Sequence, residues 1–246
     1  MMNMKGTFFA LLSMVLCLAA AEPVLEVALN DGEFGKLALI GGIAPKVSAT
    51  TLKTDKLAWG EGRLGGKALY FTEADRNVRS YGYVSIPKNA AMDFTKPFTV
   101  CCWVCPDKSI QRTKQYTIVG DIGGDRGPGW RMFFSYDALR MSCGDGKNSN
   151  GLATTPSRHP IEKGVWSHVA LTWDGNIACL YMNGALAAQS KPEKPLVWLP
   201  GSKSISIGAY RDGAAYGFLG AISDVKFFDV ALTPKEMLIL AKEIVL

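Results

Sequence analysis

The stretch that decides the fold is residues 164–189, which read GVWSHVALTWDGNIACLYMNGALAAQ. Apolar and small side chains alternate from Val169 to Trp173, and Asp174-Gly175-Asn176 then supplies the residue types that a tight antiparallel turn requires. A second alternating run ends at Asn183-Gly184, which is the strongest short-range signal for a hairpin. The pattern predicts three consecutive antiparallel strands joined by two tight turns.

Both faces of the first two of these strands carry apolar side chains, so we expect them inside a sheet whose outer face is partly covered. The segments WSHVALTWDG and LYMNG resemble the signature of laminin-G-like domains in the concanavalin A-like superfamily, with a weaker similarity to pentraxins. Other segments match that family's pattern in order: GKALYF at 66–71, YVSIP at 83–87, FTVCCWV at 98–104, SISIGA at 204–209 and FLGAISDVKFFDVALTPKEM at 218–237. The resemblance implies an all-β fold, a two-sheet antiparallel jelly-roll sandwich.

Two further segments have clear local signals. Phe98 to Cys105 is rich in β-branched and aromatic residues and is bounded by prolines, so we expect a central strand of the other sheet. Thr233-Pro234-Lys235-Glu236 has the residue types of a capping box with proline at the first helical position. This motif predicts a short C-terminal helix packed against the sandwich.

The N-terminus has the three parts of a secretory signal peptide. Lys5 precedes an apolar run that ends in Ala19-Ala20-Ala21, so residues 1–21 are predicted to be removed and residues 22–246 to form one jelly-roll domain. The run is shorter than the ~20 residues of a spanning helix, so we expect a secreted protein, extracellular or periplasmic, with no stable membrane span. A lipid anchor on Cys17 is the alternative, although Leu16 stands where such signals usually need a small residue.

Composition excludes some functions and leaves the cysteines open. The net charge of +5 over 246 residues, without a basic run, does not fit a nucleic-acid-binding surface. Cys101 and Cys102 point to opposite faces of one strand, so a disulfide from this strand would need a partner on another strand. Buried free thiols are the alternative. The five cysteines concerned are Cys101, Cys102, Cys105, Cys143 and Cys179.

Catalytic motifs are weak. Glycosidases of this fold need a strand with carboxylates at alternating positions, and the nearest approaches are isolated pairs such as Glu73 with Asp75. The histidine and arginine strand motifs of the fold's polysaccharide lyases do not accompany Tyr210 and Tyr216. We therefore expect no catalytic residues.

Loop composition favours binding. Asp121, Asp125 and Asp145 lie in glycine-rich loops and would supply oxygen ligands to a calcium ion if those loops converge, although aspartate and glycine also build ordinary turns. For a sugar, Tyr210, Tyr216 and Trp130 offer aromatic faces, and Arg211 and Asp212 offer a planar donor and a carboxylate.

The sequence thus predicts a secreted, non-catalytic binding module whose partner is a glycan or glycosylated surface. The alternative is adhesion to an extracellular protein, or assembly, without sugar binding. A polysaccharide-degrading enzyme on the same fold ranks third.

Overall fold

A computed structural model describes residues 21–32, 39–40, 56–72, 81–88, 92–121, 128–144, 149–154, 160–191, 204–211 and 213–242. The predicted signal peptide and Cys17 lie outside these ranges, apart from Ala21, and stay predictions. Within the described residues no helix is long and apolar enough to cross a membrane.

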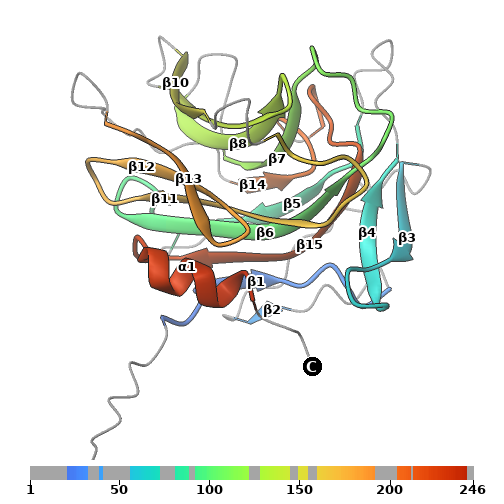
Figure 1. Cartoon of the computed structure of the whole chain (residues 1–246), viewed down its shortest axis with the longest axis horizontal. Coiled ribbons are helices and arrows are strands. Elements are labelled where there is room, and N and C mark those ends of the chain that lie inside the picture. Colours follow the sequence, from blue (N-terminus) through green and yellow to red (C-terminus); the bar gives the residue numbers. More distant parts are fainter. Residues whose placement is uncertain are drawn as a thin grey trace, which may run out of the picture.

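Two antiparallel sheets stack in layers, with the six-stranded sheet above the nine-stranded sheet in Figure 1. The larger sheet has the order β13 (Ala185–Ser190), β12 (Ala178–Met182), β11 (Ser167–Trp173), β6 (Phe98–Pro106), β15 (Gly220–Phe228), β1 (Leu25–Val27), β2 (Leu39–Ile40), with β4 (Lys67–Phe71) also pairing with β15, and β3 (Leu57–Glu61) with β4. The smaller sheet has the order β10 (Ser149–Thr154), β9 (Ala138–Gly144), β8 (Gly129–Ser135), β7 (Tyr116–Gly120), β14 (Ser204–Ile207), β5 (Val84–Pro87). The predicted all-β sandwich is confirmed.

The three strands predicted from residues 164–189 are β11, β12 and β13. The Asp174 carboxylate accepts hydrogen bonds from the backbone N–H groups of Asn176 and Ile177, which closes the first turn, and Gly175 has φ +95°. Asn183 and Gly184 form the second turn, also with positive φ. Turn chemistry that was readable from the sequence therefore builds this part of the sheet.

The expected position of residues 98–105 is wrong. Strand β6 lies beside β11 in the same sheet, with Val169 opposite Cys102 and Leu171 opposite Val100, and not in the other sheet. Its inner side chains, such as Val100, belong to the main core, and its outer Cys101 is also buried. Its residue types and bounding prolines correctly indicated a central strand, but they carry no information about which strand it pairs with.

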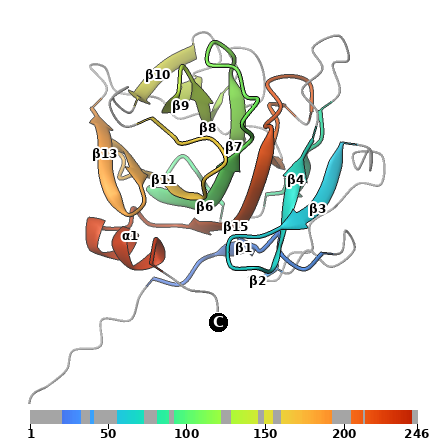
Figure 2. The same ribbon diagram turned by 45° about the vertical axis from the view of Figure 1, so that its right-hand side comes forward.

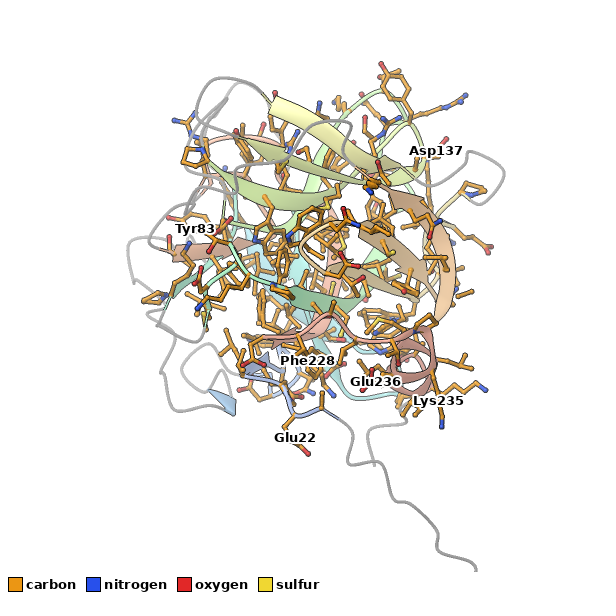
Figure 3. The ribbon with its side chains drawn as sticks, turned by 90° about the vertical axis from the view of Figure 1, so that its left-hand side faces the viewer. Glu22, Tyr83, Asp137, Phe228, Lys235 and Glu236 are labelled. Atoms are coloured by element: carbon orange, nitrogen blue, oxygen red, sulfur yellow. The ribbon has the colours of Figure 1, made fainter. Side chains whose placement is uncertain are left out.

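A second, smaller core explains the covered outer face. The predicted helix is α1 (Pro234–Leu240), it lies below the larger sheet (Figures 1 and 2), and its capping box is formed by Thr233 and Glu236. Met237 is its buried residue, and Phe228 lies beside the helix in Figure 3. The buried side chains between sheet and helix are Cys101, Ala170, Tyr181, Phe228, Leu232 and Met237.

Candidate functional site

The loop after β14 brings two predicted ligand residues together. The rings of Tyr210 and Tyr216 meet edge to face with centroids 5.4 Å apart, and the Tyr210 N–H donates to the Ala215 carbonyl. Tyr210 is only 4% exposed, whereas Tyr216 is 43% exposed and Arg211 is also exposed. Asp212 lies outside the described residues. The Tyr216 ring is therefore partly accessible to a ligand, and the buried Tyr210 ring packs against it.

Arg131 completes this group and was missed from the sequence. Its guanidinium lies 4.0 Å from the Phe133 ring centroid, 5.0 Å from that of Tyr210 and 5.2 Å from that of Tyr216. We call these four residues the tyrosine–arginine cluster. Attraction between the cation and the ring faces stabilises it. The sequence signal that could have indicated it is a charged residue inside the otherwise apolar run WRMFF.

Hydrogen bonds fix the position of Arg131. Nη2 donates to Oε1 of Gln115, and Nε donates to Oγ of Ser142 over 3.2 Å. Nη1 is buried without a hydrogen-bond partner, although an arginine offers five N–H donors. Burial lowers the pKa of Arg131, while the two tyrosines oppose that shift. The cluster thus holds a rigid cation beneath an exposed ring.

Trp130, predicted as a sugar platform, is a core residue. It is fully buried and its ring packs 5.3 Å from Phe94 and 5.1 Å from Phe98, centroid to centroid. Successive residues of a strand point to opposite faces, so Trp130 points into the core while Arg131 points outward. This placement does not support a role for Trp130 in ligand binding.

Among the predicted metal ligands, Asp121 alone is described. Its carboxylate accepts from Lys88 Nζ over 2.7 Å and from the Trp130 N–H over 2.9 Å. Burial raises the pKa of Asp121 despite the neighbouring Lys88 ammonium. Asp125 and Asp145 lie outside the described residues, in which no group of three histidine, cysteine or acidic residues is placed to hold a metal ion. The calcium site stays a prediction.

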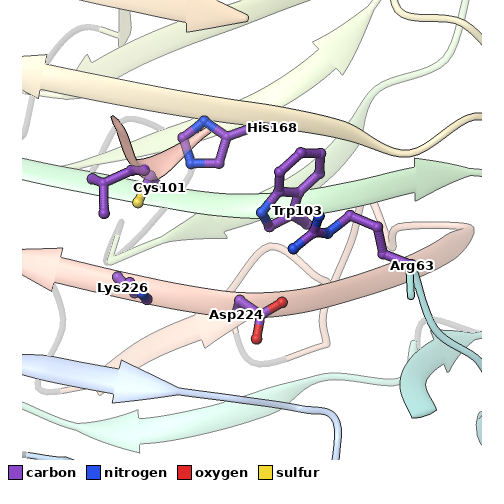
Figure 4. A pocket seen from close by; sticks show the side chains of 7 residues that line it. Arg63, Cys101, Trp103, His168, Asp224 and Lys226 are labelled. Carbon is purple, nitrogen blue, oxygen red and sulfur yellow. The ribbon is translucent and has the colours of Figure 1, made fainter. Parts of the chain in front are cut away.

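A second polar site, unnoticed in the sequence, opens on the outer face of the larger sheet beside α1 (Figure 4). Strands β6, β11 and β15, the turn between β3 and β4, and helix α1 supply its side chains. We call it the outer-face hollow, and it is lined by Arg63, Cys101, Trp103, His168, Asp224, Lys226 and Leu240.

Contacts within the hollow are aromatic and ionic. The Arg63 guanidinium lies 3.9 Å over the Trp103 ring, and the other partner of that ring is His168, 5.4 Å away edge to face. Burial, with the charges of Lys226 and Arg63, lowers the pKa of His168 from 6.5 to about 4. The imidazole is therefore neutral at physiological pH.

Asp224 enters the hollow because β15 contains a bulge. Ser223 pairs with Trp103 and Lys226 pairs with Cys101, so Asp224 and Val225 together oppose one residue of β6. Asp224 has φ +51°, and its carboxylate accepts from Asn30 and Ser223. Bulges re-aim side chains in this way. The inward-facing residues Ile222 and Val225 are three positions apart in the sequence, whereas inward-facing residues of a regular strand are two apart. This irregular spacing is the sequence signal that could have indicated the bulge.

The fold is therefore a two-sheet jelly-roll sandwich, and each sheet carries a group of polar side chains on its outer face. The laminin-G-like model of the concanavalin A-like lectin/glucanases superfamily matches residues 78–237. Since this match covers more than half of the sequence, the chain belongs to that family.

Solved structures with the same architecture include binding domains of botulinum neurotoxins. The serotype G binding domain superposes with a TM-score of 0.66 at 16% identity over 89% of this chain. The serotype D domain in complex with N-acetylneuraminic acid gives 0.65 at 17% over 89%. A type C structure, described as depending on two ganglioside molecules for cell entry, gives 0.63 at 14% over 88%. The match spans about half of each toxin chain, 50% in all three, and at these identities it shows the fold alone.

Proposed function

We propose that this chain is a secreted, non-catalytic module that binds carbohydrate through the tyrosine–arginine cluster. The observation that carries the proposal is the exposed Tyr216 ring, held by the buried Arg131 and flanked by the exposed Arg211. Sugar sites typically combine an apolar face for the ring with a few placed polar groups for the hydroxyls. The toxin domain solved with N-acetylneuraminic acid supports the idea that this scaffold suits sugars.

A glycan array probed with the purified mature chain tests this proposal. We expect bound glycans to be lost in Tyr216→Ala and in Arg211→Ala. Tyr136→Ala is the matched control, because Tyr136 is also half-exposed, at 51%, but lies in the turn between β8 and β9. An array without signal, or equal loss in the control, would contradict the proposal.

The same array, repeated with EDTA, tests the predicted calcium ion. Calcium would have to replace the Lys88 ammonium at Asp121, because that ion pair occupies the carboxylate. Loss of glycan signal with EDTA and its return with added calcium would support the ion. Unchanged glycan binding in EDTA would contradict a role for calcium in the proposed site.

Protein adhesion is the second candidate, and one surface favours it. Leu186 on β13 and Leu238 and Ile239 on α1 are exposed apolar side chains on two elements that contact each other. Such a patch is typical of protein contacts. Glycan binding that survives Leu186→Ser with Leu238→Ser would show that the two activities use different surfaces.

A further inference from the structure

One polar side chain beside the tyrosine–arginine cluster has a donor group without a partner. Gln115 directly precedes β7 and is half-buried. Its Oε1 accepts a hydrogen bond from Nη2 of Arg131, and its side chain makes no other hydrogen bond within the described part of the chain. An amide side chain offers two N–H donors in addition to its oxygen. The Nε2 group of Gln115 is therefore available to a ligand.

Arg131 determines which way this amide faces. A guanidinium donates hydrogen bonds and accepts none, so Oε1 of Gln115 must face Arg131 and Nε2 must face away from it. Arg131 is itself held by Ser142 and by the three aromatic rings of the cluster. The amide of Gln115 cannot turn over without losing its hydrogen bond to Arg131.

Arg131 also strengthens the donor group of Gln115. Arg131 is 8% exposed and has no acidic partner among the described residues, which is rare for a buried cation. Its hydrogen bond draws electron density from the amide of Gln115, and hydrogen bonds in such a chain strengthen one another. The Nε2 group should therefore bind best to an electron-rich oxygen, such as that of a carbonyl or a carboxylate.

Gln115 and Tyr216 lie on the same face of the smaller sheet. Thr117 points to the outer face because its neighbours Tyr116 and Ile118 are core residues and side chains alternate along a strand. The Thr117 N–H donates to the Tyr216 carbonyl over 2.8 Å, which holds Tyr216 beside β7, two residues from Gln115. An accessible aromatic ring and an oriented donor thus share one surface.

We propose that Gln115 donates a hydrogen bond to the ligand and selects sugars with a substituent whose oxygen only accepts, namely the carbonyl of an acetamido group or a carboxylate. The sugar packs on Tyr216, and Arg131 keeps the amide of Gln115 turned toward it. This inference rests on the proposed carbohydrate function and adds to it a further binding residue and a class of ligand.

Saturation-transfer NMR titrations of the mature chain test it with the methyl glycosides of N-acetylglucosamine, glucuronic acid and glucose. We expect the acetamido sugar, the carboxylate sugar or both to bind about tenfold more tightly than methyl glucoside, which offers only hydroxyls. The sugar that binds more tightly identifies the substituent that Gln115 recognises. Equal binding of all three sugars would overturn the inference.

Gln115→Glu separates ligand binding from a structural role. A glutamate keeps an acceptor for Arg131 and adds an opposite charge, so this variant should melt no lower than the wild type. It replaces the amide donor with an acceptor, so binding of the preferred sugar should weaken about tenfold. A variant that melts normally and binds that sugar as the wild type does would contradict the role of Gln115.

A matched control excludes a general effect of charge. Gln189→Glu makes the same change at an exposed position of β13, on the larger sheet, and should bind as the wild type does. If Gln115→Glu also binds normally while Tyr216→Ala loses its array glycans, the inference fails and the proposed function stands. If no sugar binds and the array gives no signal, the proposed function fails with it.

Discussion

His168 shows how one buried residue makes stability depend on pH. The folded protein keeps its imidazole neutral down to about pH 4, whereas in the unfolded chain it protonates near pH 6.5. Between these values the unfolded state binds more protons, so the free energy of unfolding falls as the pH decreases. At about 1.4 kcal/mol per pKa unit, the loss across this window is about 3 kcal/mol.

Urea unfolding between pH 7 and pH 4 checks this prediction. His168→Gln should lose about 3 kcal/mol less than the wild type across the window. His159→Gln is the control, since His159 is the other histidine of the chain, and it should follow the wild type. Parallel curves for the wild type and His168→Gln would show that the imidazole is not held neutral.

Two adjacent residues, Trp130 in the core and Arg131 next to Tyr216, are expected to separate stability from the proposed glycan binding. Trp130→Ala removes a fully buried ring that packs on Phe94 and Phe98 and should cost about 3–5 kcal/mol. Where this variant is still folded, its glycan affinity should equal that of the wild type. Tyr216→Ala should show the reverse, with little change in melting temperature and loss of binding. A Trp130→Ala protein that melts normally but binds no glycan would reverse the assignment.

The same two residues show what the sequence could and could not reveal. The apolar run WRMFF identified the strand, but not which of its two faces lies against the other sheet. Trp130 was chosen because an aromatic ring can stack on a sugar, and it is in the core. Arg131 on the opposite face is the residue that contacts the tyrosines.

At the scale of elements, turns and the hairpin strands that they join were predictable, and the pairing of strands far apart in the sequence was not. The turns at Asp174 and Asn183 and the capping box at Thr233 are formed by neighbouring residues, so short motifs revealed them. The pairing of β6 with β11 joins residues that are far apart in the sequence, from Val104 with Ser167 to Phe98 with Trp173, and no local pattern encodes it. Strand periodicity fixes the two faces of a strand but not its neighbours.

A pair of turn glycines tests how tightly α1 packs on β13. Gly184 has φ +80°, and a Cβ there would lie 2.9 Å from Cα of Leu238 in the helix. Gly175 has φ +95°, and a Cβ there would meet nothing within 4 Å. Both alanine variants carry the backbone cost of positive φ, ~1–2 kcal/mol, but only Gly184→Ala adds overpacking, ~1–3 kcal/mol.

Chemical unfolding of the two variants measures the difference. Gly184→Ala should be less stable than Gly175→Ala by at least about 1 kcal/mol. Equal losses would mean that the helix does not press on this turn.

At the scale of the whole molecule, the sandwich is held together without disulfides among the described cysteines. None of Cys101, Cys102, Cys105, Cys143 and Cys179 forms a disulfide in this structure, which favours the second of the two alternatives that the sequence left open. The main core between the sheets and the smaller core under α1 supply the burial instead. We expect a reductant to leave the melting temperature of the mature protein unchanged. A lower melting temperature in dithiothreitol would reveal a bridge.

The outer-face hollow could not be found from the sequence because distant parts of the chain build it. Arg63 follows β3, Trp103 lies on β6, His168 on β11, and Asp224 and Lys226 on β15. Only the order of strands in the sheet brings them together. Only part of the tyrosine–arginine cluster was predictable from the sequence. Tyr210 and Tyr216 belong to one loop and could be recognised together, whereas Arg131 comes from a distant strand.

The bulge in β15 adds one residue, Asp224, whose side chain is not part of the core between the sheets. Asp224 is a surplus residue: without it, Val225 would simply face Cys102 and the ladder would run evenly, with Ile222, Val225 and Phe227 still turned inward. A protein shortened by this one residue should keep the same side chains in the core, but it should melt at a lower temperature than the wild type because it loses the hydrogen bonds of Asp224 with Ala28, Asn30 and Ser223. A folded deletion variant would show that the pairing of β15 with β6 does not require the extra residue.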